Sequence, residues 1–87
     1  MDKKKILYIE DNISNFIFVR DILKSEGYEV VSAFNGLDGI KRASMENPSL
    51  IVLDINIPGL NGYEVCVKIR SYPFLKDVPI IVVSGDY

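Results

Sequence analysis

LIVLDINIPGLNG, residues 50–62, is the segment from which the architecture of this chain can be inferred. Its first four residues are apolar and lead to a single aspartate, Asp54, and Pro58 and Gly59 follow. An unbroken apolar run is typical of a strand buried on both faces, and a Pro-Gly pair ends regular structure. In open α/β sheets, ligands bind outside the carboxyl ends of the strands. The segment therefore predicts a buried strand that presents one carboxylate at a functional edge.

Strands and helices are expected to alternate on both sides of this segment. Apolar runs predict three more strands, at Ile6–Ile9, Glu29–Ala33 and Val78–Ser84. Spacings of three to four residues predict three helices, with apolar faces at Phe16, Val19, Ile22 and Leu23, at Leu37, Ile40 and Ala43, and at Val65, Ile69 and Tyr72. This alternation of continuous apolar strands with helices predicts an α/β fold with a parallel sheet. The Glu29–Ala33 strand is the least apolar and suits an edge of that sheet.

Capping and breaking residues set the expected ends of the helices. Asn12 and Gly27 are expected to bound the first helix, Asn35 and Pro48 the second, and Pro73 the end of the third. The chain shows no internal repeat, linker or low-complexity segment. We therefore expect residues 1–87 to belong to one domain.

Composition excludes several classes of protein. The 87 residues are 48% hydrophobic and carry a formal net charge of −2, which fits one globular domain without a nucleic-acid or membrane footprint. No apolar run approaches the length of a membrane span. The single cysteine, Cys66, cannot form an internal disulfide and fits a small core or boundary residue in a cytoplasmic protein. Because the chain contains no histidine, histidine triads and histidine-containing zinc sites are excluded.

Polar side chains follow three of the predicted strands. Glu10 and Asp11 come after the first strand, Asp54 ends the third, and Ser84 ends the fourth. The carboxyl ends of parallel strands share one edge of a sheet, so these side chains are expected to lie together. Two carboxylates about 5 Å apart at an effective dielectric near 20 repel each other by roughly 3 kcal/mol. Such a cluster requires a cation or a raised pKa to persist.

The chemistry of these side chains favours Mg²⁺ and phosphoryl transfer. Ligands that are all oxygen, with no histidine or cysteine, suit a hard cation that keeps open positions for water and phosphate. A carboxylate beside Mg²⁺ is also a credible nucleophile toward phosphorus. We therefore expect Asp54 to be the nucleophile and Glu10 and Asp11 to hold the ion. The hydroxyl of Ser84 could donate a hydrogen bond to a phosphoryl oxygen.

These residues resemble the receiver domain of two-component response regulators. The matching features are Glu10 and Asp11 after the first strand, Asp54 with Pro58, Gly59 and Gly62 behind it, and Ser84 after the fourth strand. The resemblance implies a flavodoxin-like, doubly wound sheet with strand order 2-1-3-4. It also implies that a histidine kinase or a phosphotransfer protein phosphorylates Asp54, and that turnover is limited to self-phosphorylation and slow dephosphorylation. The chain is then not an enzyme in the usual sense.

The same resemblance assigns further site residues. It implies that Mg²⁺ is bound by Asp11, Asp54 and the backbone carbonyl of Asn56, with Glu10 assisting directly or through water. Ser84 would be a switch hydroxyl that moves toward the phosphoryl group. The backbone amides of Ile55 and Gly85 would contact the phosphoryl oxygens.

The chain departs from the receiver pattern after Ser84. Receivers continue with a fourth helix, a fifth strand, a lysine that pairs with the phosphoryl group, and a fifth helix. We therefore expect residues 1–87 to be the N-terminal portion of a receiver domain. The strand near Pro79 to Val83 would then be an exposed apolar edge, and such edges associate. We expect self-association through this fourth strand.

Three alternative functions are open at this point. A Mg²⁺-dependent phosphohydrolase would need a general acid two residues after Asp54, where Asn56 cannot supply a proton. A phosphorylation-incompetent assembly or interaction module would need only the sheet and its exposed edge. A flavin-binding protein would need hydrogen-bond donors after the first strand, where the chain has the anionic Glu10 and Asp11.

Overall fold

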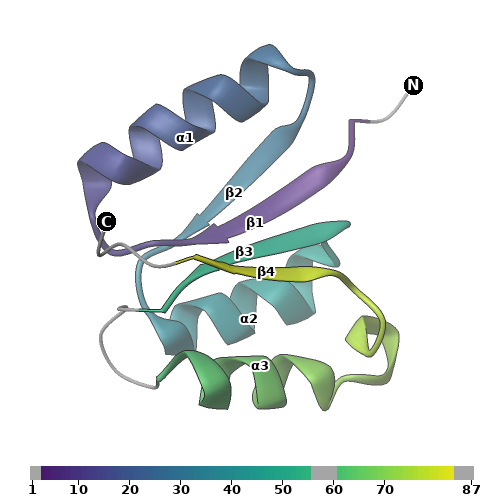
Figure 1. Ribbon diagram of the computed structural model, residues 1–87. Helices are drawn as coiled ribbons and strands as arrows, with labels where there is room; N and C mark the ends of the chain where they lie inside the picture. Colours follow the sequence, from purple (N-terminus) through teal and green to yellow (C-terminus); the bar gives the residue numbers. More distant parts are fainter. Residues whose placement is uncertain (1–2, 56–60, 84–87) are drawn as a thin grey trace.

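The computed structural model describes residues 3–55 and 61–83 and shows a parallel sheet with helices on both faces (Figure 1). The elements in chain order are β1 (Lys5–Ile9), α1 (Ile13–Ser25), β2 (Glu29–Ala33), α2 (Gly36–Glu46), β3 (Leu50–Asp54), α3 (Gly62–Arg70), the 3₁₀ turn η1 (Pro73–Leu75) and β4 (Ile80–Val83). The strands are parallel in the order β2-β1-β3-β4. The predicted fold class, strand order and edge position of Glu29–Ala33 are confirmed.

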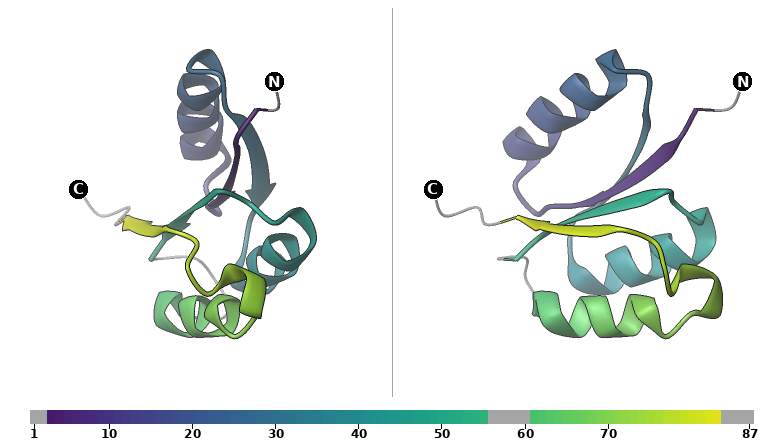
Figure 2. Two further views of the ribbon diagram at one scale, coloured as in Figure 1. Left: turned by 90° about the vertical axis from the view of Figure 1, so that its right-hand side faces the viewer. Right: turned by 45° about the vertical axis from the view of Figure 1, so that its right-hand side comes forward.

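The helices divide unequally between the two faces of the sheet. Among the described helices, α1 lies alone on one face, and α2 and α3 lie side by side on the other (Figures 1 and 2). The main hydrophobic core lies between the sheet and the α2–α3 layer and consists of the following buried residues: Leu7, Ile9, Ala33, Ala43, Ile51, Leu53, Val65, Ile69, Leu75 and Val78. Cys66 is half-buried against this core, as predicted. None of the described helices is long and apolar enough to cross a membrane.

Asparagine side chains cap all three α-helices. The side-chain oxygens of Asn12, Asn35 and Asn61 each accept a hydrogen bond from a backbone N–H three residues later. This contact satisfies one of the donors that a helix leaves unpaired at its N-terminus. The caps at Asn12 and Asn35 are therefore confirmed, and the cap at Asn61 was not anticipated. Gly27 follows α1 with φ of 93°, which confirms it as the residue that ends this helix.

Two of the predicted helix faces are only partly correct. On α1, Phe16 is buried, but Ile22 is 49% exposed because no other described helix packs against this helix. On α2, Ala43 is buried as predicted, whereas Leu37 is 67% exposed. α2 packs closely on β1 through Gly39, where an added Cβ would lie only 2.5 Å from Cδ1 of Ile9. Because Leu37 is two residues from Gly39, about 200° around the helix, it lies on the side of α2 away from the sheet.

The third helix is shorter than predicted. α3 ends at Arg70, so Tyr72 lies beyond the helix, although its side chain still packs against the core. Pro73 does not end α3 but begins η1. Proline favours a first helical position because its fixed φ suits a helix and its missing N–H is not needed there. The sequence interpretation treated Pro73 only as a breaker and missed this turn.

The fourth strand also begins later than predicted. It starts at Ile80, and Val78 belongs to the turn before it, where its N–H donates to the carbonyl of Leu75 at 3.3 Å. The predicted end at Ser84 lies outside the described residues. Within the described part of the chain, β4 forms one edge of the sheet.

Candidate functional site

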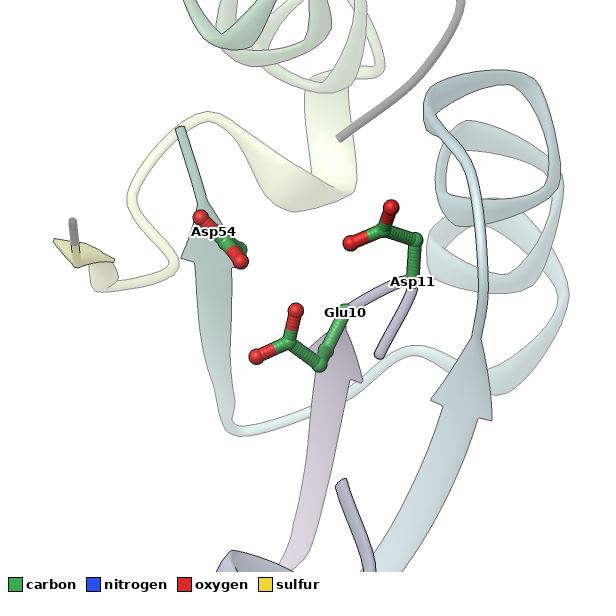
Figure 3. Close-up of side chains that lie close together, drawn as sticks. All are labelled: Glu10, Asp11 and Asp54. Carbon is green, nitrogen blue, oxygen red and sulfur yellow. The ribbon is translucent and has the colours of Figure 1, made fainter. Parts of the chain in front are cut away.

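Three carboxylates meet at the carboxyl ends of β1 and β3. Asp54 is the last residue of β3, and Glu10 and Asp11 directly follow β1. One oxygen from each of the three side chains lies within 4.8 Å of the other two. All three carboxylates point toward a common space (Figure 3). The sequence prediction that these residues come together is confirmed.

The parallel sheet fixes the backbone on both sides of this cluster. The N–H of Glu10 donates to the carbonyl of Ala33 at 2.9 Å, which extends the β1–β2 pairing by one residue. Asp54 lies opposite Val83 in the β3–β4 register. Since β1 and β3 pair directly, Glu10 and Asp54 leave neighbouring strands at the same edge. Asp11 precedes the cap residue of α1, so the start of that helix determines where its carboxylate lies.

The charges in this cluster are not equally exposed to water. Glu10 is 3% exposed and Asp54 4%, whereas Asp11 is exposed. Burial raises the pKa of Glu10 above its ordinary value, and the neighbouring carboxylate of Asp54 raises this pKa further. Hydrogen bonds from the backbone N–H of Asn12 and from the hydroxyl of Tyr8 lower the pKa of Glu10 and offset part of this rise.

The raised pKa of Glu10 leads to a prediction for the metal-free protein. A carboxyl group whose pKa is higher in the folded than in the unfolded state contributes its full stabilisation at pH values below its unfolded pKa, near 4.5. This contribution is lost as the pH rises through the folded pKa. We expect Glu10→Gln to reduce this loss of stability. Urea unfolding of both proteins between about pH 4 and pH 8 would measure it. The exposed Glu26→Gln is the control, and equal pH slopes for wild type and Glu10→Gln would contradict the prediction.

Comparison with known proteins identifies the family of this chain. Residues 6–87 match the family model described as "Response regulator receiver domain". The chain belongs to this family. The predicted resemblance to response-regulator receivers is therefore confirmed, and the acidic cluster lies in a receiver domain.

Curated relatives and solved structures agree with the receiver assignment. The chain is 39% identical over 85 residues to the probable transcriptional regulator ycf27 of Cyanophora paradoxa, matching 98% of this chain and 34% of that protein. It is 33% identical over 82 residues to the polar-differentiation response regulator DivK of Brucella anthropi, matching 94% of this chain and 67% of that protein. The chain thus spans about a third of the first relative and about two thirds of the second.

One similar solved structure contains a metal ion. The receiver domain of a sensor histidine kinase from Pseudomonas aeruginosa superposes with a TM-score of 0.92 and 29% identity, covering 98% of this chain and 70% of that one. In that protein, a magnesium ion is coordinated in the active-site cleft.

Several predicted site residues of this receiver domain are not described. Asn56, Ser84 and Gly85 lie outside the described residues, so their predicted roles stay predictions. Ile55 is described, and its N–H donates to the carbonyl of Val83 at 2.9 Å. For the Ile55 amide to contact a phosphoryl oxygen, as predicted, this hydrogen bond would have to be shared or broken.

Tyr8 is a member of the receiver site that the sequence interpretation missed. Its hydroxyl donates to Oε1 of Glu10 at 3.2 Å, and its ring lies 5.7 Å from that of Phe16. Residues two apart on a strand share a face. The two-residue spacing between Tyr8 and Glu10 could have indicated this contact. The sequence interpretation, however, treated Tyr8 only as part of an apolar strand. Tyr8 links the buried carboxylate to the packing of α1.

Proposed function

We propose that this receiver domain accepts a phosphoryl group on Asp54 from a histidine kinase or a phosphotransfer protein, in a Mg²⁺-dependent reaction. The observation that carries the proposal is the convergence of three carboxylates from two neighbouring strand ends, two of them buried. The repulsion among these charges, roughly 3 kcal/mol for a close pair, is a cost that a structural role alone does not explain. Membership of the receiver family adds support.

The donor set fits Mg²⁺. The three side chains offer only oxygen atoms, which Mg²⁺ prefers, and three carboxylates alone would leave coordination positions for water and phosphate oxygens. Glu10, Asp11 and Asp54 would hold the ion, and the backbone carbonyl of Asn56 is proposed as a further ligand. When bound, Mg²⁺ would reduce the repulsion between the attacking carboxylate and the phosphoryl group.

The chain's own residues would carry out the transfer as follows. A carboxylate oxygen of Asp54 attacks the phosphorus of phosphohistidine, the P–N bond breaks, and its electron pair stays on the imidazole, which takes up a proton. β3 holds Asp54 in place, because the residue is buried and in register with Val83. The proposed role of Ser84, and of the amides of Ile55 and Gly85, is to donate hydrogen bonds to the phosphoryl oxygens.

Intact-mass spectrometry with a small phosphodonor tests this proposal. Wild-type protein is incubated with acetyl phosphate, with and without Mg²⁺, and treated afterwards with hydroxylamine. We expect a gain of one phosphoryl group that requires Mg²⁺ and is removed by hydroxylamine, because an acyl phosphate is cleaved by this nucleophile whereas a serine phosphate is not. Folded protein that gains no mass would refute the proposal.

A second candidate function rests on the exposed edge of the sheet. Ile81 and Val82 on β4 are 50% and 48% exposed, one on each face. We also propose that residues 1–87 represent the N-terminal portion of a receiver domain and that this chain self-associates through β4, as an assembly or interaction module. Cytoplasmic location and the absence of nucleic-acid and membrane partners stay predictions.

Self-association is a prediction that light scattering can measure. We expect the average mass of the wild-type chain to rise with concentration, and Val82→Lys to reduce this rise because a charged edge residue opposes strand pairing. Val67→Lys, on the exposed surface of α3, is the matched control. A monomer at every concentration would contradict the prediction.

A further inference from the structure

A basic cavity lies between α1 and the edge strand β2, and none of the three carboxylates of the acidic cluster lines it. It has a volume of about 530 Å³ and is formed between α1 and β2, with Lys3, Phe16, Arg20, Lys24, Glu29 and Ser32 among its lining residues. Lys3 precedes β1, Glu29 begins β2, and Lys24 is in the last turn of α1, whereas the carboxylates follow the ends of β1 and β3. The cavity is therefore separate from the proposed phosphorylation site.

One flank of α1 forms the wall of this cavity. Phe16, Arg20 and Lys24 are spaced four residues apart, which places them in a row along the helix. The exposed apolar residues Phe18 and Ile22 lie on a different side of α1, because they are two residues out of step with this row. A protein segment that covered Phe18 and Ile22 would consequently leave the cavity open.

Arg20 is held in position inside the cavity wall. Its guanidinium carbon lies 5.9 Å from the centre of the Phe16 ring. Its Nε and Nη2 donate to one carboxylate oxygen of Asp21 at 3.1 and 3.0 Å. These contacts leave Nη1 without a hydrogen-bond partner among the described residues. An arginine fixed on two sides loses less conformational freedom when it binds an anion.

The edge strand β2 offers hydrogen-bond donors beside the cavity. Glu29 donates its N–H to Lys4, and Ala33 accepts from Glu10, so the backbone groups of these alternate residues face β1. The N–H groups of Val30 and Ser32, which alternate with them, consequently point to the free edge of the described sheet. Both residues line the cavity. Ser32 also offers a hydroxyl group that can donate to an oxyanion.

The charge around the cavity is opposite in sign to that of the whole chain. The formal net charge of the chain is −2, yet the cavity lining holds three cations, Lys3, Arg20 and Lys24, and one carboxylate, Glu29. Asp21, which pairs with Arg20, is a second carboxylate nearby, and the local balance stays positive by one charge. Its volume falls within the range of pockets that bind small molecules. We propose that this cavity binds a small organic polyanion, a molecule with an apolar body and two or more carboxylate or phosphate groups.

Each part of this ligand has a place in the cavity. One anionic group lies between Arg20 and Lys24 on the helix, and another lies near Lys3 at the start of β1. Carboxylates and phosphates both match the fork of the arginine side chain. The apolar body contacts the exposed parts of Val30 and of the Tyr28 ring, both in the cavity lining.

NMR titration of the ¹⁵N-labelled chain in metal-free, low-salt buffer tests this proposal, with citrate as the carboxylate probe and ADP as the phosphate probe. We expect saturable, one-to-one shifts for at least one probe, confined to amides of residues 16–24 and 28–32. Binding by citrate alone or by ADP alone would support the proposal and identify the preferred anionic group. Shifts that do not saturate, or that spread over all lysines, would overturn it.

Two double variants with the same loss of charge make the test specific. Arg20→Gln with Lys24→Gln is expected to weaken binding at least ten-fold. Lys41→Gln with Arg42→Gln removes one lysine and one arginine from α2, outside the cavity, and is expected to change affinity by less than two-fold. Well-dispersed amide spectra confirm that both proteins are folded. An equal loss of affinity in the two variants would show non-specific attraction and overturn the proposal.

Discussion

Asp54→Asn is expected to abolish phosphorylation by acetyl phosphate and, in the same protein, to increase stability. The variant keeps the shape of the side chain but removes the nucleophilic carboxylate, so no phosphoryl gain should be seen by intact-mass spectrometry. It also removes one of two buried carboxylates that lie side by side. We expect the free energy of unfolding at neutral pH without metal to rise by about 1–3 kcal/mol, from the repulsion that is relieved.

The stability gain of Asp54→Asn should depend on Mg²⁺. An ion that binds the folded wild type as proposed would stabilise it by mass action, whereas the variant, which lacks one proposed ligand, would gain less. Urea unfolding with and without Mg²⁺ measures this difference. Asp77→Asn, at an exposed position away from the cluster, is the control and should keep both phosphorylation and stability. Phosphorylation of Asp54→Asn at the wild-type rate would refute the assignment of the phosphoacceptor.

Arg70→Met is expected to destabilise the fold by roughly 2–3 kcal/mol, the size of a charged hydrogen bond lost with its partly buried partners. Nη1 of Arg70 donates to the carbonyl oxygens of Leu75 at 3.1 Å and of Lys76 at 3.2 Å, and also to that of Val78. These contacts hold the connection between η1 and β4 against the end of α3. Methionine keeps much of the volume of the arginine but has no donor.

Urea unfolding of Arg70→Met, Arg70→Lys and Lys68→Met tests this prediction. Arg70→Lys should recover part of the loss, because an ammonium group can donate to these carbonyls but lacks the planar geometry of the guanidinium. Lys68 is an exposed residue of the same helix, so Lys68→Met should change stability by less than about 0.5 kcal/mol. If Arg70→Met reduced the free energy of unfolding no more than Lys68→Met does, the proposed role of Arg70 in holding this connection would be wrong.

The parts of the fold that the sequence predicted correctly depend on local signals. β3 and β1 are recognisable because strands buried on both faces are continuous apolar runs, and this placed Asp54 and Glu10 at one edge. The caps Asn12 and Asn35 were predictable because the capping hydrogen bond involves residues only three positions apart. The strand order came from the resemblance to receivers, since spacing along one chain does not specify which strands pair.

The features that the sequence did not reveal depend on contacts between distant residues. The periodicity of α1 indicated its apolar face but could not show whether another element covers it, and Ile22 is consequently exposed. The hydrogen bonds of Arg70 and the cavity between Lys3 and Arg20 require the chain to be folded before they can be seen. In the site, the burial of Glu10 and its contact with Tyr8 were hidden for the same reason.

The isolated position of α1 has a consequence for metal affinity. No residue of α1 belongs to the main core, so local opening of this helix requires less free energy than opening of the α2–α3 layer. Asp11 immediately precedes the cap of α1 and would move with it. Undocking of α1 would therefore lower the apparent affinity of the proposed site for a cation, and a bound cation would slow amide hydrogen exchange throughout the helix. Docking of α1 and ion binding at the proposed site would then be thermodynamically coupled.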